Sequence, residues 1–196
     1  MTADFLERWL EAVLDTPGAT GLGSTDDARR VLLDDAVRAA PLVDSLAGPI
    51  VDVGSGWGSP GIPLAAALPA RSFTLLEAER RKCALLERFA SELPNVVVVC
   101  GRAEEQSVET FGVALAKALA KPPVAAELCL PLVSTGGTAI VWLGRSADRS
   151  ALARTAERVG GNLESESAGL AILRKVEPTP PGFPRRPGMA KKRPLG

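Results

Sequence analysis

The chain has 196 residues, 46% of them hydrophobic, and its 23 basic side chains are balanced by 23 acidic ones. A chain of this length can bury about 70% of the surface that it exposes when unfolded, so one domain with a single core is expected. The sequence holds no histidine, which excludes the Ser-His-Asp and Cys-His arrangements of nucleophilic catalysis. No run of eighteen apolar residues occurs, so no membrane-spanning helix is expected.

The first predicted element is an amphipathic helix over residues 4–14, in which Phe5, Trp9 and Val13 recur at helical spacing. Acidic residues interrupt this segment and no basic region precedes it, so it is not predicted to be a signal peptide. A cytoplasmic location is therefore expected.

The pattern changes after this start to alternating apolar strands and amphipathic helices, which predicts a mostly parallel twisted sheet with helices on both faces. Helices are predicted at 4–14, from a Ser24 or Thr25 N-cap to Pro41, and at 61–68, 79–93, 122–132 and 148–159. Strands are predicted at 50–53, 72–76, 95–100, 113–116, 138–143 and 169–174. The segment from Asn95 to Cys100 is almost all valine, which indicates a strand buried on both faces.

The three cysteines, Cys83, Cys100 and Cys129, are an odd number without CxxC spacing. A structural zinc site needs four nitrogen or sulfur ligands, and the chain offers three. Neither a disulfide nor a metal site is therefore predicted. All three cysteines lie among apolar residues and are expected to be buried, which argues against a cysteine nucleophile.

A glycine-rich loop follows the first strand and carries the pattern Asp52-x-Gly54-x-Gly56-x-Gly58. Glycines there allow a sharp turn and close approach of the backbone to a ligand. The spacing Gly56-x-Gly58-x-x-Gly61 also matches a dinucleotide fingerprint, so a nicotinamide site is one alternative. The aspartate inside the strand, together with the lack of a hydride-acceptor site, favours S-adenosylmethionine (SAM), whose amino group Asp52 would hold.

The second strand ends at Glu77. An acid at this position, about 20 residues after the glycine loop, can accept hydrogen bonds from both hydroxyl groups of a ribose. Glu77 is therefore predicted to bind the adenosine half of the cofactor. The alternative is an ordinary solvated acid at the end of a strand.

Four segments, DVGSGWGSPGIPLA, LLEAERRKCALLERF, VVCGRAEE and FPRRPGMAKKRPL, resemble the RsmG (GidB) family of guanine-N7 methyltransferases of small-subunit rRNA. The resemblance implies a Rossmann-like class I methyltransferase fold, SAM as cofactor and 16S rRNA of the small ribosomal subunit as partner, without a metal or a membrane. The order of the predicted elements indicates a helical lead-in over 1–45, a SAM-binding domain over 46–176 and a Pro-rich basic segment over 177–196, and a monomer is expected. The resemblance also implies that Gly54, Ser59, Ala103 and Glu104 line the SAM pocket.

The chain departs from the family pattern at several of these positions. Lys117 stands where the family usually has an arginine, and Ser59 replaces a bulkier residue. Residues 31–35 read Val-Leu-Leu-Asp-Asp, where the family has a histidine ahead of an Asp-Ser pair. Lys117 keeps the positive charge but loses the bidentate fork of arginine, so it remains a candidate for contact with SAM or RNA. It is also the one candidate catalytic residue. Two alternatives stay open: a SAM enzyme acting on another RNA or a small molecule, and a non-catalytic ribosome-binding protein.

Basic side chains in two places are candidates for RNA binding. Segment 178–196 holds five basic residues and no acidic one, while the rest of the chain is net negative, so a polyanion is expected to be held mainly at one place. A shorter basic run starts the helix after Glu77. The candidates are Arg81, Lys82, Arg185, Arg186, Lys191 and Lys192. The alternatives are a solvated helix face and a disordered tail.

Overall fold

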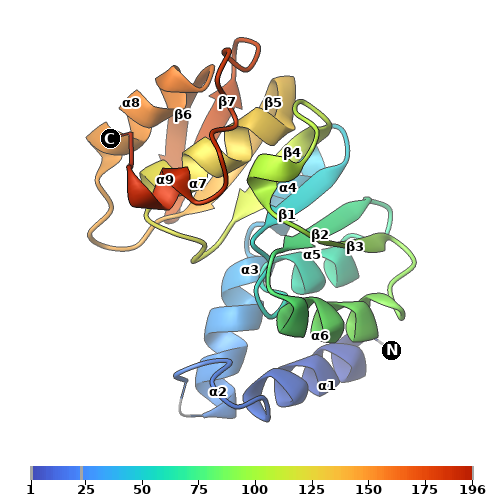
Figure 1. Ribbon diagram of the computed structural model, residues 1–196. Helices are drawn as coiled ribbons and strands as arrows, with labels where there is room; N and C mark the ends of the chain where they lie inside the picture. The colour runs from blue at the N-terminus through green and yellow to red at the C-terminus, as the bar shows by residue number, and fades with distance from the viewer. Residues whose placement is uncertain (1, 23, 196) are drawn as a thin grey trace.

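A seven-stranded sheet with the strand order β3-β2-β1-β4-β5-β7-β6 forms the centre of the protein (Figure 1). The computed structural model describes residues 2–22 and 24–195. The strands are β1 (Ile50–Val53), β2 (Phe73–Glu77), β3 (Val96–Cys100), β4 (Phe111–Ala116), β5 (Val133–Trp142), β6 (Gly161–Ser167) and β7 (Leu170–Lys175). The first five strands are parallel to one another, and β7 runs antiparallel to β5 and β6. The predicted mostly parallel sheet is thereby confirmed.

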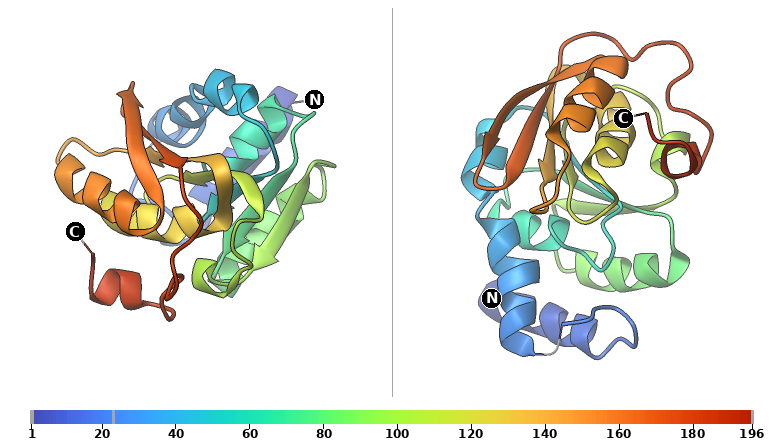
Figure 2. Two further views of the ribbon diagram at one scale, coloured as in Figure 1. Left: turned by 90° about the horizontal axis from the view of Figure 1, so that it is seen from above. Right: turned by 90° about the vertical axis from the view of Figure 1, so that its left-hand side faces the viewer.

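Helices cover both faces of this sheet because side chains alternate along each strand. In β1, Val51 and Val53 pack with α7 (Pro122–Cys129) and α8 (Arg149–Arg158). Ile50 packs on the opposite face, with α4 (Ala40–Ser45) and α5 (Gly61–Ala67). Figure 2 shows the two layers of helices on either side of the strands. The other elements are α1 (Thr2–Leu14), α2 (Thr25–Ala28), η1 (Arg29–Asp34), α3 (Asp35–Val37), α6 (Arg80–Ala90), η2 (Ala103–Glu105), η3 (Leu130–Leu132) and α9 (Met189–Lys192).

The N-terminal helices pack against the glycine-loop side of the sheet. Trp9 is fully buried and clusters with Ile62 of α5 and Leu86 of α6. The Ser24 hydroxyl accepts a hydrogen bond from the amide of Asp27. Of the two predicted N-cap residues, Ser24 is therefore the one that caps α2. The helix that follows contains a π-helical segment, η1, and π-helical turns often occur at functional sites. Within the described residues no helix is long and apolar enough to cross a membrane.

The prediction that the valine-rich strand is buried on both faces is wrong. β3 lies at the edge of the sheet, and the Val97 side chain is 62% exposed. Cys100, predicted to be buried, is exposed. Sheet order, which the valine run does not encode, determines how much of a strand is covered. The opposite edge strand, β6, was missed because it consists largely of exposed polar residues.

The exclusion of a disulfide is also wrong, because Cys83 and Cys100 are joined by one. Cys100 lies beside Glu77 in the register of β2 and β3, and Cys83 lies in the first turns of the helix that follows β2. This places the two Cα atoms 5.8 Å apart, within the range of disulfide bonds. Counting cysteines cannot reveal such a pairing. Cys129 is buried as predicted, and burial raises the pKa of its thiol.

Candidate functional site

The carboxyl ends of four neighbouring strands surround a cavity of about 480 Å³. The glycine loop follows β1, Glu77 ends β2, Gly101 follows β3 and Lys117 follows β4. Open α/β sheets bind ligands at this edge, where the order of the strands reverses. Seven of the nine predicted cofactor residues line the cavity: Gly54, Gly56, Ser59, Glu77, Ala103, Glu104 and Lys117.

The glycine loop takes its shape from left-handed backbone conformations. Gly54 and Gly56 have φ angles of 67° and 58°, which side chains other than glycine rarely adopt. A Cβ atom on Gly54 would also lie 2.3 Å from the Leu119 side chain. A Cβ atom on Gly58 would lie 2.6 Å from the Ile62 side chain and 3.0 Å from Trp9 Nε1. Glycine at this position therefore allows close packing behind the loop.

Asp52 lies beneath the loop, outside the lining of the cavity. Its side chain is fully buried, and Oδ2 accepts a hydrogen bond of 2.9 Å from the amide of Gly61 at the start of α5. Oδ1 is buried without a hydrogen-bond partner among the described residues. Burial raises the pKa of Asp52 to about 7, although the Gly61 hydrogen bond opposes the shift. The carboxylate therefore supports the loop and keeps one acceptor oxygen unsatisfied.

Glu77 connects the end of its own strand to the glycine loop. Oε2 accepts a hydrogen bond of 2.9 Å from the amide of Gly56, and Oε1 accepts one of 2.8 Å from the amide of Glu79. A carboxylate offers about four lone-pair positions, so each oxygen keeps capacity for a ligand hydroxyl. The carboxylate is thus fixed by the backbone before any ligand binds.

The C-terminal segment closes the β3 side of the cavity. Glu104 Oε1 accepts a hydrogen bond of 2.8 Å from the amide of Gly188, and Gly188, Ala190 and Lys191 line the cavity. In Figure 2 the segment with α9 lies on the same side of the sheet as α7 and α8. The tail is anchored by Arg185, whose Nε and Nη2 donate to the two oxygens of the buried Glu127 at 2.6 and 2.7 Å.

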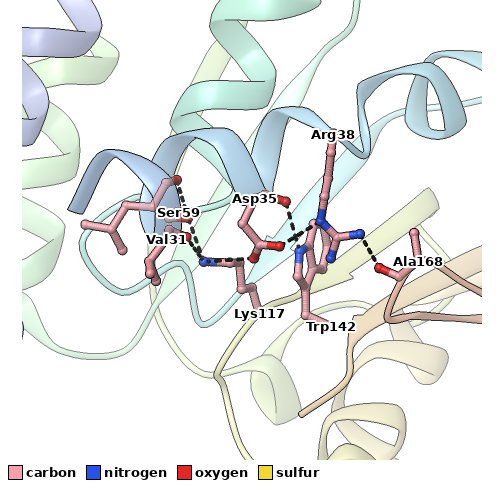
Figure 3. A network of polar contacts seen from close by, with 8 residues as sticks. Val31, Asp35, Arg38, Ser59, Lys117, Trp142 and Ala168 are labelled. Carbon is pink, nitrogen blue, oxygen red and sulfur yellow. Dashed lines mark hydrogen bonds and ion pairs between the residues drawn. The ribbon is translucent and has the colours of Figure 1, made fainter. Parts of the chain in front are cut away.

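Lys117 lies on the β4 side of the cavity, and its side chain is only 10% exposed. Its Nζ donates to the carbonyl oxygen of Val31 at 2.6 Å and to Ser59 Oγ at 3.3 Å, and lies 3.6 Å from the Asp35 carboxylate (Figure 3). Burial lowers the pKa of the Lys117 ammonium group, and Asp35 opposes this shift.

The N-terminal helices supply a wall of the cavity that the sequence did not predict. The lining residues from this region are Trp9, Val13, Ala19, Thr20, Val31 and Leu32. Trp57 of the glycine loop joins them, and its backbone oxygen accepts a hydrogen bond from Trp9 Nε1 at 2.8 Å. The apolar stripe of the first helix identifies a buried face, but no local signal shows which cavity that face adjoins.

The predicted RNA-binding side chains fall into two environments. Arg81 and Lys82 lie 5.6 and 5.8 Å from the centre of the Trp57 ring, and Lys82 also lines the cavity. The exposed ones on the tail are Arg186, Lys191 and Lys192. Arg185 differs from these because Glu127 and the carbonyl oxygen of Arg193 engage its guanidinium group.

The sheet order, the glycine loop and the acid at the end of β2 define a class I SAM-dependent methyltransferase fold. Two solved structures share it: TYW2 of M. jannaschii in complex with AdoMet (TM-score 0.54, 14% identity, 71% of each chain covered) and a SAM-dependent O-methyltransferase of Thermotoga maritima (TM-score 0.59, 12% identity, 88% of this chain and 72% of that chain covered). At this identity the likeness concerns the fold.

The sequence comparisons identify the family. The chain belongs to the GidB family, rRNA small subunit methyltransferase G, which matches residues 3–166. A relative called ribosomal RNA small subunit methyltransferase G from Synechococcus sp. (strain JA-2-3B'a(2-13)) is 39% identical over 165 residues, which are 74% of this chain and 64% of the relative. The match to this relative thus spans less than two thirds of its length. A relative of the same name from Moorella thermoacetica is 34% identical over 85% of this chain and 78% of its own. The predicted family is confirmed.

Proposed function

We propose that the protein transfers the methyl group of SAM to N7 of a guanine in 16S rRNA of the small ribosomal subunit, as a cytoplasmic monomer. Family membership supports the class of substrate, and the cavity supports the cofactor. The observation that carries the proposal is the set of acceptor groups at the strand ends: Glu77, held by two backbone amides, and the buried Oδ1 of Asp52, which has no hydrogen-bond partner in the part of the chain that the structure describes.

These groups match the polar parts of SAM. An unsatisfied buried carboxylate oxygen favours a cationic donor, and the amino group of SAM is one, either directly or through a water molecule. The lone pairs left on Glu77 suit the ribose hydroxyls. Ala103 and Glu104 then lie at the adenine end, beneath the tail.

The reaction requires positioning more than proton transfer. Guanine N7 is unprotonated and has an exposed lone pair, so no general base has to remove a proton. SAM supplies an electrophilic methyl group. The chain's own residues orient the two reactants for an in-line approach, and such orientation can contribute about 7–11 kcal/mol to lowering the barrier. The absence of histidine from the sequence is compatible with this chemistry.

RNA is proposed to lie across the mouth of the cavity, between the helix α6 and the tail. Arg81 and Lys82 flank one side, and Arg186, Lys191 and Lys192 lie on the other. Such side chains neutralise phosphates without reading sequence. Arg185 is assigned to anchoring the tail because its donors are already engaged by Glu127.

The test is incubation with SAM and undermethylated small ribosomal subunits, followed by mass spectrometry of the nucleosides for 7-methylguanosine. Product is expected with the wild-type chain and with Glu164→Gln, which changes an exposed acid on the far edge strand β6. Glu77→Gln should abolish SAM binding and product together, because its amide NH2 would face one of two backbone N–H groups. SAM binding without product would favour a different acceptor, and absence of SAM binding would leave only a ribosome-binding role.

A further inference from the structure

One polar network joins residues from three separate parts of the chain. Lys117, Ser59 and the segment 31–35 are far apart in sequence, yet they meet at the β4 side of the cavity (Figure 3). Ser59 Oγ donates to the carbonyl oxygen of Leu32 at 2.7 Å and accepts from Lys117. Two consecutive carbonyl groups of the π-helical segment η1 are therefore bound by residues from two different loops of the sheet.

The network extends from Lys117 to Asp35, its ion-pair partner, and holds the Asp35 side chain in place. Asp35 Oδ1 accepts a hydrogen bond from Arg38 Nε at 2.7 Å, and Arg38 also donates to the carbonyl oxygen of Ala168 in the β6–β7 turn. The backbone oxygen of Asp35 accepts from Trp142 Nε1 at 3.3 Å. Asp35 is thus held in place by the ends of two further strands, and its carboxylate is directed toward Lys117.

The contacts of the Lys117 ammonium group are all with groups of the protein. An ammonium group has three N–H donors; two of them form hydrogen bonds with Val31 and Ser59, and the charge is paired with Asp35. These contacts indicate that Lys117 positions other groups. What it positions is η1, whose residues Val31 and Leu32 line the cavity.

We propose that Lys117 and Asp35 form a clamp that fixes η1 against the glycine loop and sets the cavity wall beside which the methyl acceptor binds. The inference rests on the proposed function, which assigns the adenosine of SAM to one end of the cavity and the methyl acceptor to the other. The adenosine-binding residues lie at the ends of β2 and β3, whereas the clamp lies on the other side of the loop, next to β4. The clamp therefore controls the placement of the acceptor base more than the binding of SAM.

The experiment compares Lys117→Met, Lys117→Arg and Asp35→Asn with a matched control, Glu164→Gln. Glu164 forms an exposed ion pair of 3.7 Å with Arg174 on the far edge of the sheet. Hydrogen exchange of backbone amides 29–38, measured by mass spectrometry, should rise roughly tenfold in Lys117→Met and Asp35→Asn and stay unchanged in the control. This measurement requires no activity, so it tests the clamp even if the proposed reaction is wrong.

The kinetic arm uses SAM and small subunits. Lys117→Met should lower kcat by roughly 10- to 100-fold, the effect of a misplaced reactant, while the Kd for SAM changes less than threefold. Lys117→Arg, which keeps the charge opposite Asp35, should recover most of the activity. Combining Lys117→Met with Asp35→Asn should add little, because both remove the same pair. Unchanged exchange over 29–38, or a Kd for SAM that rises in parallel with the loss of kcat, would overturn the clamp.

Discussion

Burial of the Asp52 carboxylate is expected to lower the stability of the folded protein as pH rises toward 7, although the same carboxylate is proposed to help bind SAM. The pKa of Asp52 rises from 3.8 to about 7 because the side chain is fully buried, and a shift of this size corresponds to about 4 kcal/mol. In the unfolded chain the group loses its proton near pH 3.8, whereas in the folded chain it keeps the proton until about pH 7. Folding therefore binds a proton in this window, and the contribution of Asp52 to stability falls as pH rises through it.

Asp52→Asn should remove this pH dependence. The free energy of unfolding of the wild type, minus that of the variant, should fall by about 1.4 kcal/mol per pH unit between about pH 4 and pH 7 and then become constant. The new amide places N–H donors where Oδ1 has no partner among the residues that the structure describes, which costs about 1–3 kcal/mol at every pH. The pH-dependent part of the difference is therefore the quantity to test.

Urea unfolding of both proteins across this pH range measures the difference, since all other titrating groups cancel. Asp44→Asn serves as the control for the loss of one exposed carboxylate, because the Asp44 side chain is 61% exposed. SAM binding should weaken in Asp52→Asn even where the variant is the more stable protein. A difference that stays constant from pH 4 to pH 8 would refute the assignment of Asp52 as an acid protonated by burial.

Three further predictions concern the tail and the cysteines. Arg185→Met should lower the free energy of unfolding by about 3 kcal/mol, because it leaves Glu127, only 3% exposed, buried without a partner. Adding Glu127→Leu should restore part of the loss in urea unfolding. Neutralising Arg186, Lys191 and Lys192 should flatten the dependence of log K for RNA binding on log salt by roughly 0.7 per lost phosphate contact. An unchanged slope would place RNA elsewhere. Alkylation of the unfolded protein without reductant should modify Cys129 alone, and prior reduction should expose all three cysteines. Three modified residues without reductant would contradict the disulfide.

The parts of the structure that the sequence predicted correctly are those with local signals. Strand β1, the glycine loop and Glu77 follow one another within 28 residues, and parallel pairing of β1 with β2 brings the loop and the acid together. The edge position of β3 was not predictable in this way. A run of valines shows that a segment is apolar but gives no information on how many strands flank it.

Asp52 shows a second limit of prediction from the sequence. Its place inside the first strand predicted contact with the cofactor, but alternation along β1 directs its side chain toward α5, where the amide of Gly61 binds it. The other oxygen, Oδ1, accepts no hydrogen bond from residues 2–22 or 24–195. The contact of Asp52 with the cofactor stays a prediction, and its position beneath the loop follows from the packing of α5 against the sheet, which the pattern does not encode.

The substitutions at the β4 side of the cavity show why family departures cannot be judged one at a time. Lysine in place of arginine at position 117 alone predicts a weakened contact, because the bidentate fork is lost. In the structure, Asp35 supplies a carboxylate 3.6 Å from the lysine, and the Ser59 hydroxyl binds both Lys117 and Leu32. The three positions therefore support one another, and the effect of a change at one of them depends on the other two.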